Sequence, residues 1–272
     1  MSIFFFFFLG SIVGSFLNVV ALRLEAGTDF IRGRSACPEC RAPIVWYDNI
    51  PLFSFLALRG KCRACRVAIP WRYPLVEFGT GIVYIGTVSL FFNLVETSAW
   101  IETVWLLGLF SLFIVIALYD ARTLEIPVVL LHVGALWTIG ALLMLDWHLS
   151  TNMMWSVDGR TVSGLLGALG AWVFFAALSF FSREKWMGWG DSWLAAIVGL
   201  SVGIQGVFFA LTLAFGIGAL FSCVLLLRKK VAMTTQVPFG PFLVIGLVAY
   251  FFLSRLDIFQ YGRNVWIVNL FS

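Results

Sequence analysis

The chain has 272 residues, of which 61% are hydrophobic and only 12% are charged, with a formal net charge of +4. Soluble domains are about a quarter charged, so this composition excludes an ordinary soluble enzyme. It predicts a protein that crosses a membrane several times. A helix that crosses a bilayer needs about 20 mostly apolar residues, and several stretches of the chain have that character.

Eight apolar windows follow one another along the chain, and two of them are shorter than a full crossing. They cover residues 2–22, 75–95, 102–119, 127–146, 163–182, 192–204, 206–227 and 239–254. The first lacks the basic start of a signal peptide and is longer than a signal-peptide core, so we interpret it as a retained helix. The expected domains are a first transmembrane helix (1–22), a polar insert (23–74) and a core of about seven helices (75–272).

Lysine and arginine gather on one side of this eight-span arrangement. Nine lie in the insert and six more in alternate loops, whereas only three fall on the opposite side. The six loop residues are Arg122, Arg183, Lys185, Arg228, Lys229 and Lys230, and the opposite three are Arg160, Arg255 and Arg263. Because cytoplasmic loops carry the excess of positive charge, we expect the insert to be cytoplasmic and both termini to lie outside.

The insert contains two cysteine pairs, Cys37-Pro-Glu-Cys40 and Cys62-Arg-Ala-Cys65. Two C-x2-C knuckles supply the four thiolates of a closed, tetrahedral zinc site, which is structural because it has no open position for water. A reducing cytoplasm argues against disulfides, and a metal would stabilise an insert with little apolar core. The alternative is four reduced cysteines without a metal. Cys223 lies alone in a span and is expected to be a packing residue.

Two aspartates occupy the predicted cytoplasmic ends of helices. Asp120 follows a long apolar run, and Asp191 ends the sequence Gly188-Trp-Gly-Asp191 before a short span. Ionisable groups at the edge of the hydrocarbon are costly and often functional. Two carboxylates brought together there would share one proton, as in aspartic proteases. The alternative for each residue alone is a helix-end carboxylate paired with a nearby arginine.

Other ionisable residues are weaker candidates. Glu77 and Glu125 lie near the same predicted face and are possible substrate or cofactor contacts. His132 falls within a span and His148 falls on the outer side, and no H-E-x-x-H pattern points to a metalloprotease.

Several motifs along most of the chain resemble those of the bacterial prepilin peptidase (type IV leader peptidase) family of membrane aspartic proteases. They are Gly14-Ser-Phe-Leu-Asn-Val-Val20 with Arg23-Leu24, the two cysteine pairs, Asp48-Asn-Ile-Pro-Leu52, Leu58-Arg-Gly-Lys-Cys62, Arg72-Tyr-Pro-Leu-Val-Glu77, Asp120-Ala-Arg-Thr with Ile126-Pro127, Gly188-Trp-Gly-Asp191 and Pro238-Phe-Gly-Pro-Phe242. Together they predict an all-α polytopic membrane protein of about eight transmembrane helices with a zinc-ribbon-like cytoplasmic insert between the first two.

The resemblance implies that Asp120 and Asp191 form the catalytic dyad of an inner-membrane enzyme. The expected substrates are type IV prepilins and type II secretion pseudopilins, cleaved after the glycine that ends a short basic leader. The family also implies methylation of the new N-terminus with S-adenosylmethionine, and it identifies no residues here for that donor. The lipid bilayer is the other expected partner, and no nucleic acid is expected.

Two positions depart from the family pattern. Val128 stands where an aspartate commonly follows Ile-Pro, and Trp193 stands where a lysine commonly follows the G-x-G-D aspartate. A basic leader must also approach a face of the protein that is itself basic. We expect this repulsion to be offset by anionic headgroups, the dyad, Glu39 or Asp48. The alternative function is a non-catalytic, zinc-containing membrane assembly factor of a pilus or secretion system.

Overall fold

A computed structural model describes residues 3–28, 35–93, 95–148, 159–228 and 237–255. The helices are α1 (Ile3–Glu25), α2 (Phe53–Ala57), α3 (Arg72–Phe91), α4 (Thr97–Thr123), α5 (Val128–His148), α6 (Arg160–Ser182), α7 (Trp189–Leu227) and α8 (Gly240–Ser254), with a 3-10 turn η1 (Trp46–Asn49) in the insert. Six of these helices are long and apolar enough to cross a membrane, and α8 is a shorter apolar helix. Within the described ranges no strand forms, which confirms the all-α prediction.

The sequence forms helices because its apolar runs carry backbone groups that lipid cannot satisfy. In hydrocarbon, an unpaired amide or carbonyl costs several kcal/mol, so a spanning segment must pair its backbone within itself. The long helices expose apolar side chains on their outward faces, as Leu136 of α5 and Phe208 of α7 do. Their inward faces pack around fully buried residues such as Phe110, Phe113 and Phe175.

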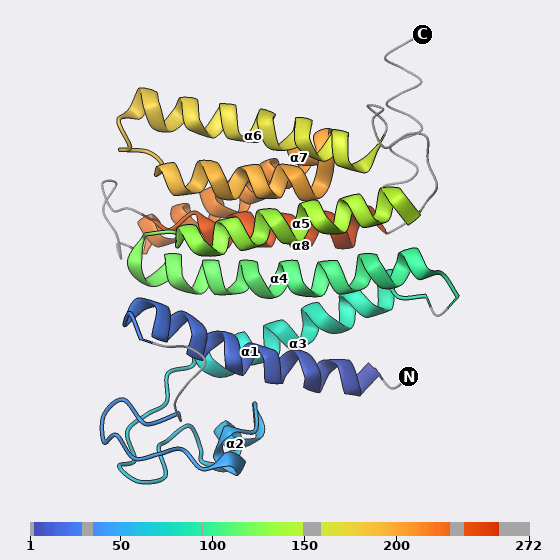
Figure 1. Ribbon diagram of the computed structural model, residues 1–272. Helices are drawn as coiled ribbons and strands as arrows, with labels where there is room; N and C mark the ends of the chain where they lie inside the picture. The colour runs from blue at the N-terminus through green and yellow to red at the C-terminus, as the bar shows by residue number, and fades with distance from the viewer. Residues whose placement is uncertain (1–2, 29–34, 94, 149–158, 229–236, 256–272) are drawn as a thin grey trace.

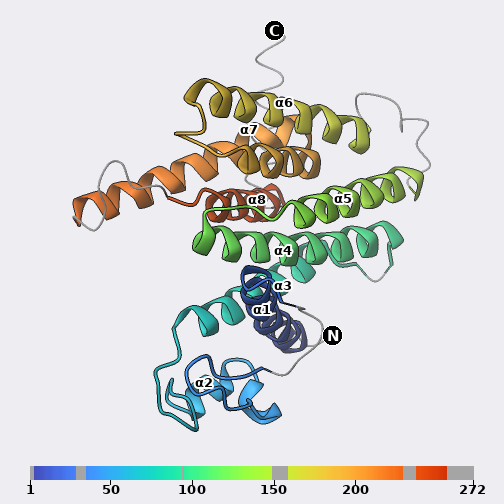
Figure 2. The ribbon, with the colours of Figure 1, turned by 60° about the vertical axis from the view of Figure 1, so that its left-hand side comes forward.

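The helices lie in successive layers, with α4 near the middle of the bundle. In Figures 1 and 2, α6 lies at the top, α5 and α8 lie below it, then α4, then α1 with α3, and the insert lies lowest. Helix α4 packs against α1, α3, α5 and α8, while α7 packs against α5, α6 and α8. A large apolar core joins α4 through α8, and a smaller cluster of Leu17, Val20, Ala21 and Val115 fixes α1 to α4.

Helix α7 consists of two antiparallel segments that meet at Gly203. That glycine has φ 74° and ψ 175°, a conformation in which a side chain would be strained. Trp193 contacts Trp172 of α6, and Phe215 stacks on Phe175 of the same helix. In a straight helix, the 22 residues from Trp193 to Phe215 would separate them by about 33 Å. The chain therefore folds back at Gly203, close to the predicted boundary between windows 192–204 and 206–227.

With α7 divided in this way, and apart from the five-residue α2, the described chain has eight apolar helical segments, as predicted. The main differences are in the limits: window 102–119 extends to Thr97–Thr123, and window 75–95 becomes Arg72–Phe91. The first change lengthens the helix at both ends, whereas the second adds three residues at the start and removes four at the end; all of these shifts fall at the membrane edge, where hydropathy alone does not define an end.

Charged residues mark the two ends of the bundle. At one end Glu102 accepts an ion pair from Arg255 at 2.9 Å and lies 4.0 Å from Arg160. At the other end Arg122 pairs with Glu25 at 2.5 Å, so the last turns of α1 and α4 are level with each other. The 18 residues from Glu102 to Asp120 span about 27 Å of helix, which is close to the roughly 30 Å thickness of bilayer hydrocarbon. Arg160 and Arg255 thus share one end, as the charge pattern predicted, and Arg263 lies outside the described residues.

Candidate active site

Asp120 lies in the last turn of α4 with only 4% of its surface exposed. The backbone N–H of Gly240, the first residue of α8, donates a 2.8 Å hydrogen bond to its Oδ2 atom. A Cβ atom at position 240 would lie 2.6 Å from that same oxygen, so the contact requires glycine. The motif Pro238-Phe-Gly-Pro-Phe242 therefore has a physical role, because it delivers a backbone donor to Asp120 from 120 residues away.

Asp191 lies in the first turn of α7, at the same end of the bundle as Asp120. The N–H of Gly188, which caps this helix, donates to the Oδ2 of Asp191 at 3.2 Å. A Cβ on Gly190 would come within 3.1 Å of the Cβ of Ile126, so this glycine allows the G-x-G-D turn to pack against the loop that follows Asp120. The two aspartate motifs are thus in direct contact.

Both carboxylates line one cavity of about 780 Å³, and they interact electrostatically with each other. Its apolar wall comes from α5, α6 and α7 and includes Leu131, Ala135, Ile139, Leu165, Ala168, Ala196, Ile197 and Leu200. Glu125 and Glu184 also line it, and both side chains are exposed to solvent. The cavity therefore combines four carboxylates with a long apolar surface.

The structure places the weaker candidates in different regions: two of them line the aspartate cavity and the others do not. Glu125 and His132 line the aspartate cavity, whereas His148 lies at the opposite end of α5. Glu77 does not line the cavity: it is buried in α3 and accepts a 2.9 Å hydrogen bond from the N–H of Leu52 in the insert. Asp48 is bound through both oxygens to Arg63, at 2.6 and 2.7 Å. That ion pair lowers the pKa of Asp48 and occupies the carboxylate that the sequence suggested for a basic leader.

The two positions that depart from the family pattern, Val128 and Trp193, both line the cavity. Sequence reasoning did not identify Glu184 or the donor role of Gly240. Glu184 lies in the short loop between α6 and α7, only seven residues before Asp191, so its closeness in sequence to the G-x-G-D motif was a signal that could have identified it. The signal for Gly240 was present in its motif, but its partner is 120 residues distant.

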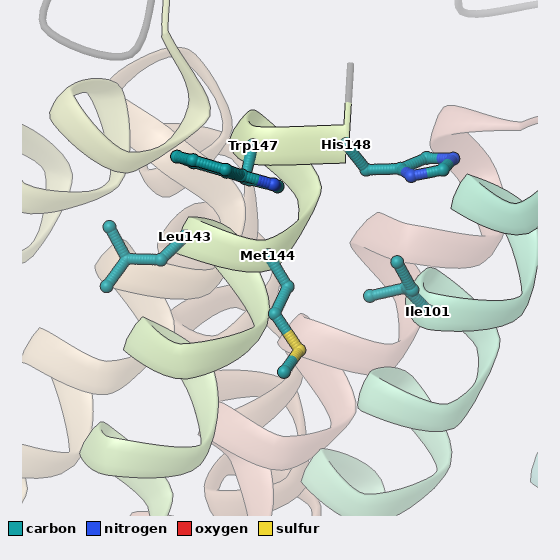
Figure 3. Close-up of a pocket in the computed structure, with 5 residues that line it drawn as sticks. All are labelled: Ile101, Leu143, Met144, Trp147 and His148. Atoms are coloured by element: carbon teal, nitrogen blue, oxygen red, sulfur yellow. The ribbon is translucent and has the colours of Figure 1, made fainter. Parts of the chain in front are cut away.

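A second hollow lies at the other end of the bundle, lined by Ile101, Leu143, Met144, Trp147 and His148 (Figure 3). It has a volume of about 470 Å³ and is open to the surroundings. Trp147 and Met144 are themselves largely exposed. The hollow contains no carboxylate, and the aspartates line the other cavity, so it is not a candidate for hydrolysis.

The four cysteines of the insert converge on one point. Their sulfur atoms all lie within 4.8 Å of one another, and the Sγ atoms of Cys37 and Cys65 are 3.9 Å apart. Zinc–sulfur bonds of about 2.3 Å in a tetrahedron place sulfurs roughly 3.8 Å apart, so the donor set fits a zinc ion. Cys223 is not part of the cluster.

The two knuckles repeat one backbone pattern that the sequence analysis did not identify. In each knuckle, the arginine that follows the second cysteine donates its backbone N–H to the carbonyl oxygen of the first cysteine. This arginine lies in the left-handed region of backbone conformation, with φ 55° at Arg41 and φ 62° at Arg66. Backbone hydrogen bonds from Cys65 and Ala64 lower the pKa of Cys62 to about 7. The pKa of Cys65 is raised to about 11: a backbone hydrogen bond from Val67 lowers it, but desolvation and hydrogen bonds with the other three cysteines outweigh that contact. A thiolate is the form that binds a metal, so the local geometry at Cys62 favours a metal ligand.

Comparison with known proteins identifies the family. Residues 8–91 match the Bacterial Peptidase A24 N-terminal domain, and residues 107–223 match the Type IV leader peptidase family. Several curated relatives carry the name prepilin leader peptidase/N-methyltransferase. The one from Pseudomonas aeruginosa is 32% identical over 88% of this chain and 86% of its own length. Those from Vibrio cholerae (28%, covering 90% and 94%) and Aeromonas hydrophila (30%, covering 88% and 87%) are similarly complete matches.

No solved structure matches this chain. The two family matches together cover most of its length, and they include both aspartates and all four clustered cysteines. The chain therefore belongs to the type IV leader peptidase family.

Proposed function

We propose that this protein is a membrane aspartic endopeptidase that removes the short basic leader from type IV prepilins and type II secretion pseudopilins. Cleavage follows the glycine that ends the leader, at the cytoplasmic face of the inner membrane. The observation that carries the proposal is the pair Asp120 and Asp191, which come from helix ends far apart in the sequence and line one cavity.

The chemistry requires the two carboxyl groups to share one proton. The ionised partner removes a proton from a water molecule, whose oxygen attacks the carbonyl carbon of the leader glycine. The protonated partner donates to the carbonyl oxygen, as in aspartic proteases. The C–N bond then breaks: the departing amine takes up the proton that the water lost, and the former carbonyl oxygen returns its proton to the carboxylate that supplied it, which restores the dyad. In this scheme Gly240 and Gly188 hold the carboxylates in position through their N–H groups.

The apolar wall of the cavity suits the hydrophobic helix that follows the leader in these substrates. That helix partitions into lipid, so its N-terminal end would arrive at the level of the aspartates. The wall residues of α5, α6 and α7 offer it a continuous apolar surface beside the dyad. Binding the helix there would hold the scissile bond close to the carboxylates, which lowers the entropic part of the barrier.

Glu125 and Glu184 explain how a basic leader can bind to a face of the protein that is rich in arginine. Both line the cavity that contains the dyad, and both are exposed, so either can meet a lysine or arginine of the leader. They replace Asp48 in this role, because Arg63 already occupies Asp48. Exposed ion pairs are weakened by salt, so recognition of the leader should decrease as ionic strength rises.

The cytoplasmic placement rests on charge. Arg122, Arg183 and Arg228 lie at the helix ends that share the level of the dyad, and the insert adds further basic residues. Such an excess marks the cytoplasmic side of membrane proteins. The N-terminus of α1 would then lie outside.

We extend the proposal to a second activity, N-methylation of the new N-terminal residue with S-adenosylmethionine as the methyl donor. The names of the relatives support it, as does the four-cysteine insert, which accompanies the bifunctional form of the family. Zinc, bound by Cys37, Cys40, Cys62 and Cys65, would be structural, because four protein ligands leave no open position.

The test is incubation of the purified protein with a prepilin, with and without S-adenosylmethionine, followed by mass spectrometry of the product N-terminus. Cleavage after the leader glycine in both reactions, with a 14 Da increase only when the donor is present, supports both activities. An intact prepilin in both reactions contradicts the proposal and favours a non-catalytic assembly factor.

A further inference from the structure

The insert contains an apolar segment that its overall basic character conceals. Residues 50–58 read Ile-Pro-Leu-Phe-Ser-Phe-Leu-Ala-Leu, which includes helix α2 and has no charged side chain. Aromatic residues flank it, with Trp46 and Tyr47 on one side and Trp71 on the other. The structure leaves these side chains uncovered: Trp46 is 80% exposed, Leu56 and Trp71 are each 71% exposed, and Phe53 is 56% exposed.

Contacts with α1 and α3 place this segment well below the end of the bundle that holds the aspartates. Gly14 of α1 packs against the Cα of Glu77, whose carboxylate accepts the N–H of Leu52. Eleven residues of α1 separate Gly14 from Glu25, which corresponds to about 16 Å along the helix. Phe53 stacks on Phe8, which lies further still from Glu25.

The charged residues at the two ends of the bundle mark the edges of the hydrocarbon, so this distance can be related to a depth in the membrane. Glu25 is level with Arg122, just beyond Asp120, and the 27 Å from Asp120 to Glu102 matches the hydrocarbon thickness. A segment about 16 Å from the level of Glu25 therefore lies inside the hydrocarbon. In Figure 1, α2 lies below the middle of α1 rather than beyond either of its ends, and the stacking of Phe53 on Phe8 joins the two helices.

The exposed surface of this segment continues the lipid-facing surface of the neighbouring helices. Phe4, Phe5, Phe8, Ile12 and Phe16 of α1 are exposed, as are Leu75, Phe78 and Ile82 of α3. An apolar patch of this extent is not stable in water and requires a cover. Arg59, Lys61 and Arg63 follow the segment, and their long side chains can extend their charged ends toward anionic lipid headgroups.

We propose that α2 and its flanking aromatic residues are embedded in the bilayer, with α2 reaching toward its middle from the cytoplasmic side. The insert is then anchored in the membrane beside α1 and α3, and the hydrogen bond from Leu52 to Glu77 fixes its depth. Trp46, Tyr47 and Trp71 act as interfacial anchors, a position for which amphipathic aromatic rings are suited.

The experiment uses the full chain in phospholipid nanodiscs with a photoreactive phenylalanine analogue at single positions. Position 56 tests the proposal, and position 46 provides a second probe of the same segment. Leu136, an exposed residue in the middle of α5, gives the lipid-facing reference, and Glu39, an exposed residue of the first knuckle, gives the aqueous reference. Zinc content shows that each variant keeps its insert folded.

We expect a phospholipid adduct at position 56 at least tenfold more abundant than at position 39, and within about threefold of that at position 136. A yield at positions 56 and 46 closer to that of position 39 overturns the proposal and places the segment in water. Adducts at position 56 with a second protein copy instead of lipid also overturn it. Either result is independent of peptidase activity.

Discussion

The cysteine cluster and the aspartate pair are both small groups of acidic side chains, but different parts of the structure bring their members together. The cysteines come from two knuckles within 29 residues, and each knuckle is closed by its own backbone hydrogen bonds. The aspartates come from α4 and α7, and Gly240 of α8 supplies a donor to one of them. The first site is therefore set by local sequence, whereas the second depends on the packing of three helices.

The largest expected effect comes from breaking the packing that supports Asp120. The substitution Gly240→Val places side-chain atoms where the Oδ2 of Asp120 now lies, because even a Cβ would approach it to 2.6 Å. A displacement of about 1 Å at a reacting group can cost about a hundredfold in rate, so we expect cleavage of a prepilin to fall by at least that factor.

Its matched control is Gly140→Val in α5, where an added Cβ meets no atom within 4 Å. Cleavage by this variant should stay within about twofold of the parent. Equal losses in the two variants would show that Gly240 has no special relation to Asp120. Zinc content should be unchanged in both, since the cysteine cluster is local.

A smaller effect is expected from the acidic side chains at the edge of the cavity. The double substitution Glu125→Gln and Glu184→Gln removes two charges that we assign to the basic leader. We expect KM to rise about tenfold at low salt, with kcat little changed, and the difference to shrink at high salt because exposed charges are screened. Glu39, which the sequence also suggested for the leader, does not line the dyad cavity, so Glu39→Gln is the control and should leave KM unchanged. A KM that is insensitive to the double substitution rules out the leader-binding role.

Breaking the cysteine cluster should affect cleavage least. Cys37→Ser removes one of four ligands, so zinc should be lost and the insert should become sensitive to proteolysis. The aspartates lie on other helices, and we expect cleavage to fall by less than about tenfold. Metal analysis and limited proteolysis report on the insert, and the prepilin assay reports on the dyad. A complete loss of cleavage would mean that the two regions are not separable.

The cluster should also depend on pH in a defined direction. In the metal-free cluster the pKa of Cys62 is lowered from 9.0 to about 7, which contributes stability that is lost as pH falls through about 7. The pKa of Cys65 is raised from 9.0 to about 11, which contributes stability that is lost as pH rises through about 11. Protons compete with zinc for the same thiolates, so a chelator should remove zinc more readily at pH 6 than at pH 8. Zinc retention that is equal at both pH values would contradict this assignment of Cys62.

Much of this structure could be predicted from the sequence, because the patterns that predict it involve neighbouring residues or sums over many residues. The eight apolar windows, the charge asymmetry and the C-x2-C spacing each depend on neighbouring residues. The parity of the spans then placed Asp120 and Asp191 at one end, and the structure has them there. What could not be inferred was which distant group meets Asp120, since the N–H of Gly240 reaches its carboxylate only through the packing of α8 against α4.

The apolar segment of the insert was overlooked for a different reason. The basic residues between Arg23 and Arg72 dominate the average over that stretch, so residues 50–58 did not register as hydrophobic. Their length is also too short for a crossing helix. Only the contacts of Leu52 with Glu77 and of Phe53 with Phe8 reveal at which level they lie.

The central claim, that Asp120 and Asp191 act together in peptide hydrolysis, is tested most directly by two single substitutions. Asp120→Asn and Asp191→Asn keep the shape of each side chain and remove its ability to share a proton. With a purified prepilin substrate, each variant should lose cleavage by roughly a thousandfold or more while keeping its zinc and its thermal stability. Near-normal cleavage by either folded variant would contradict the assignment.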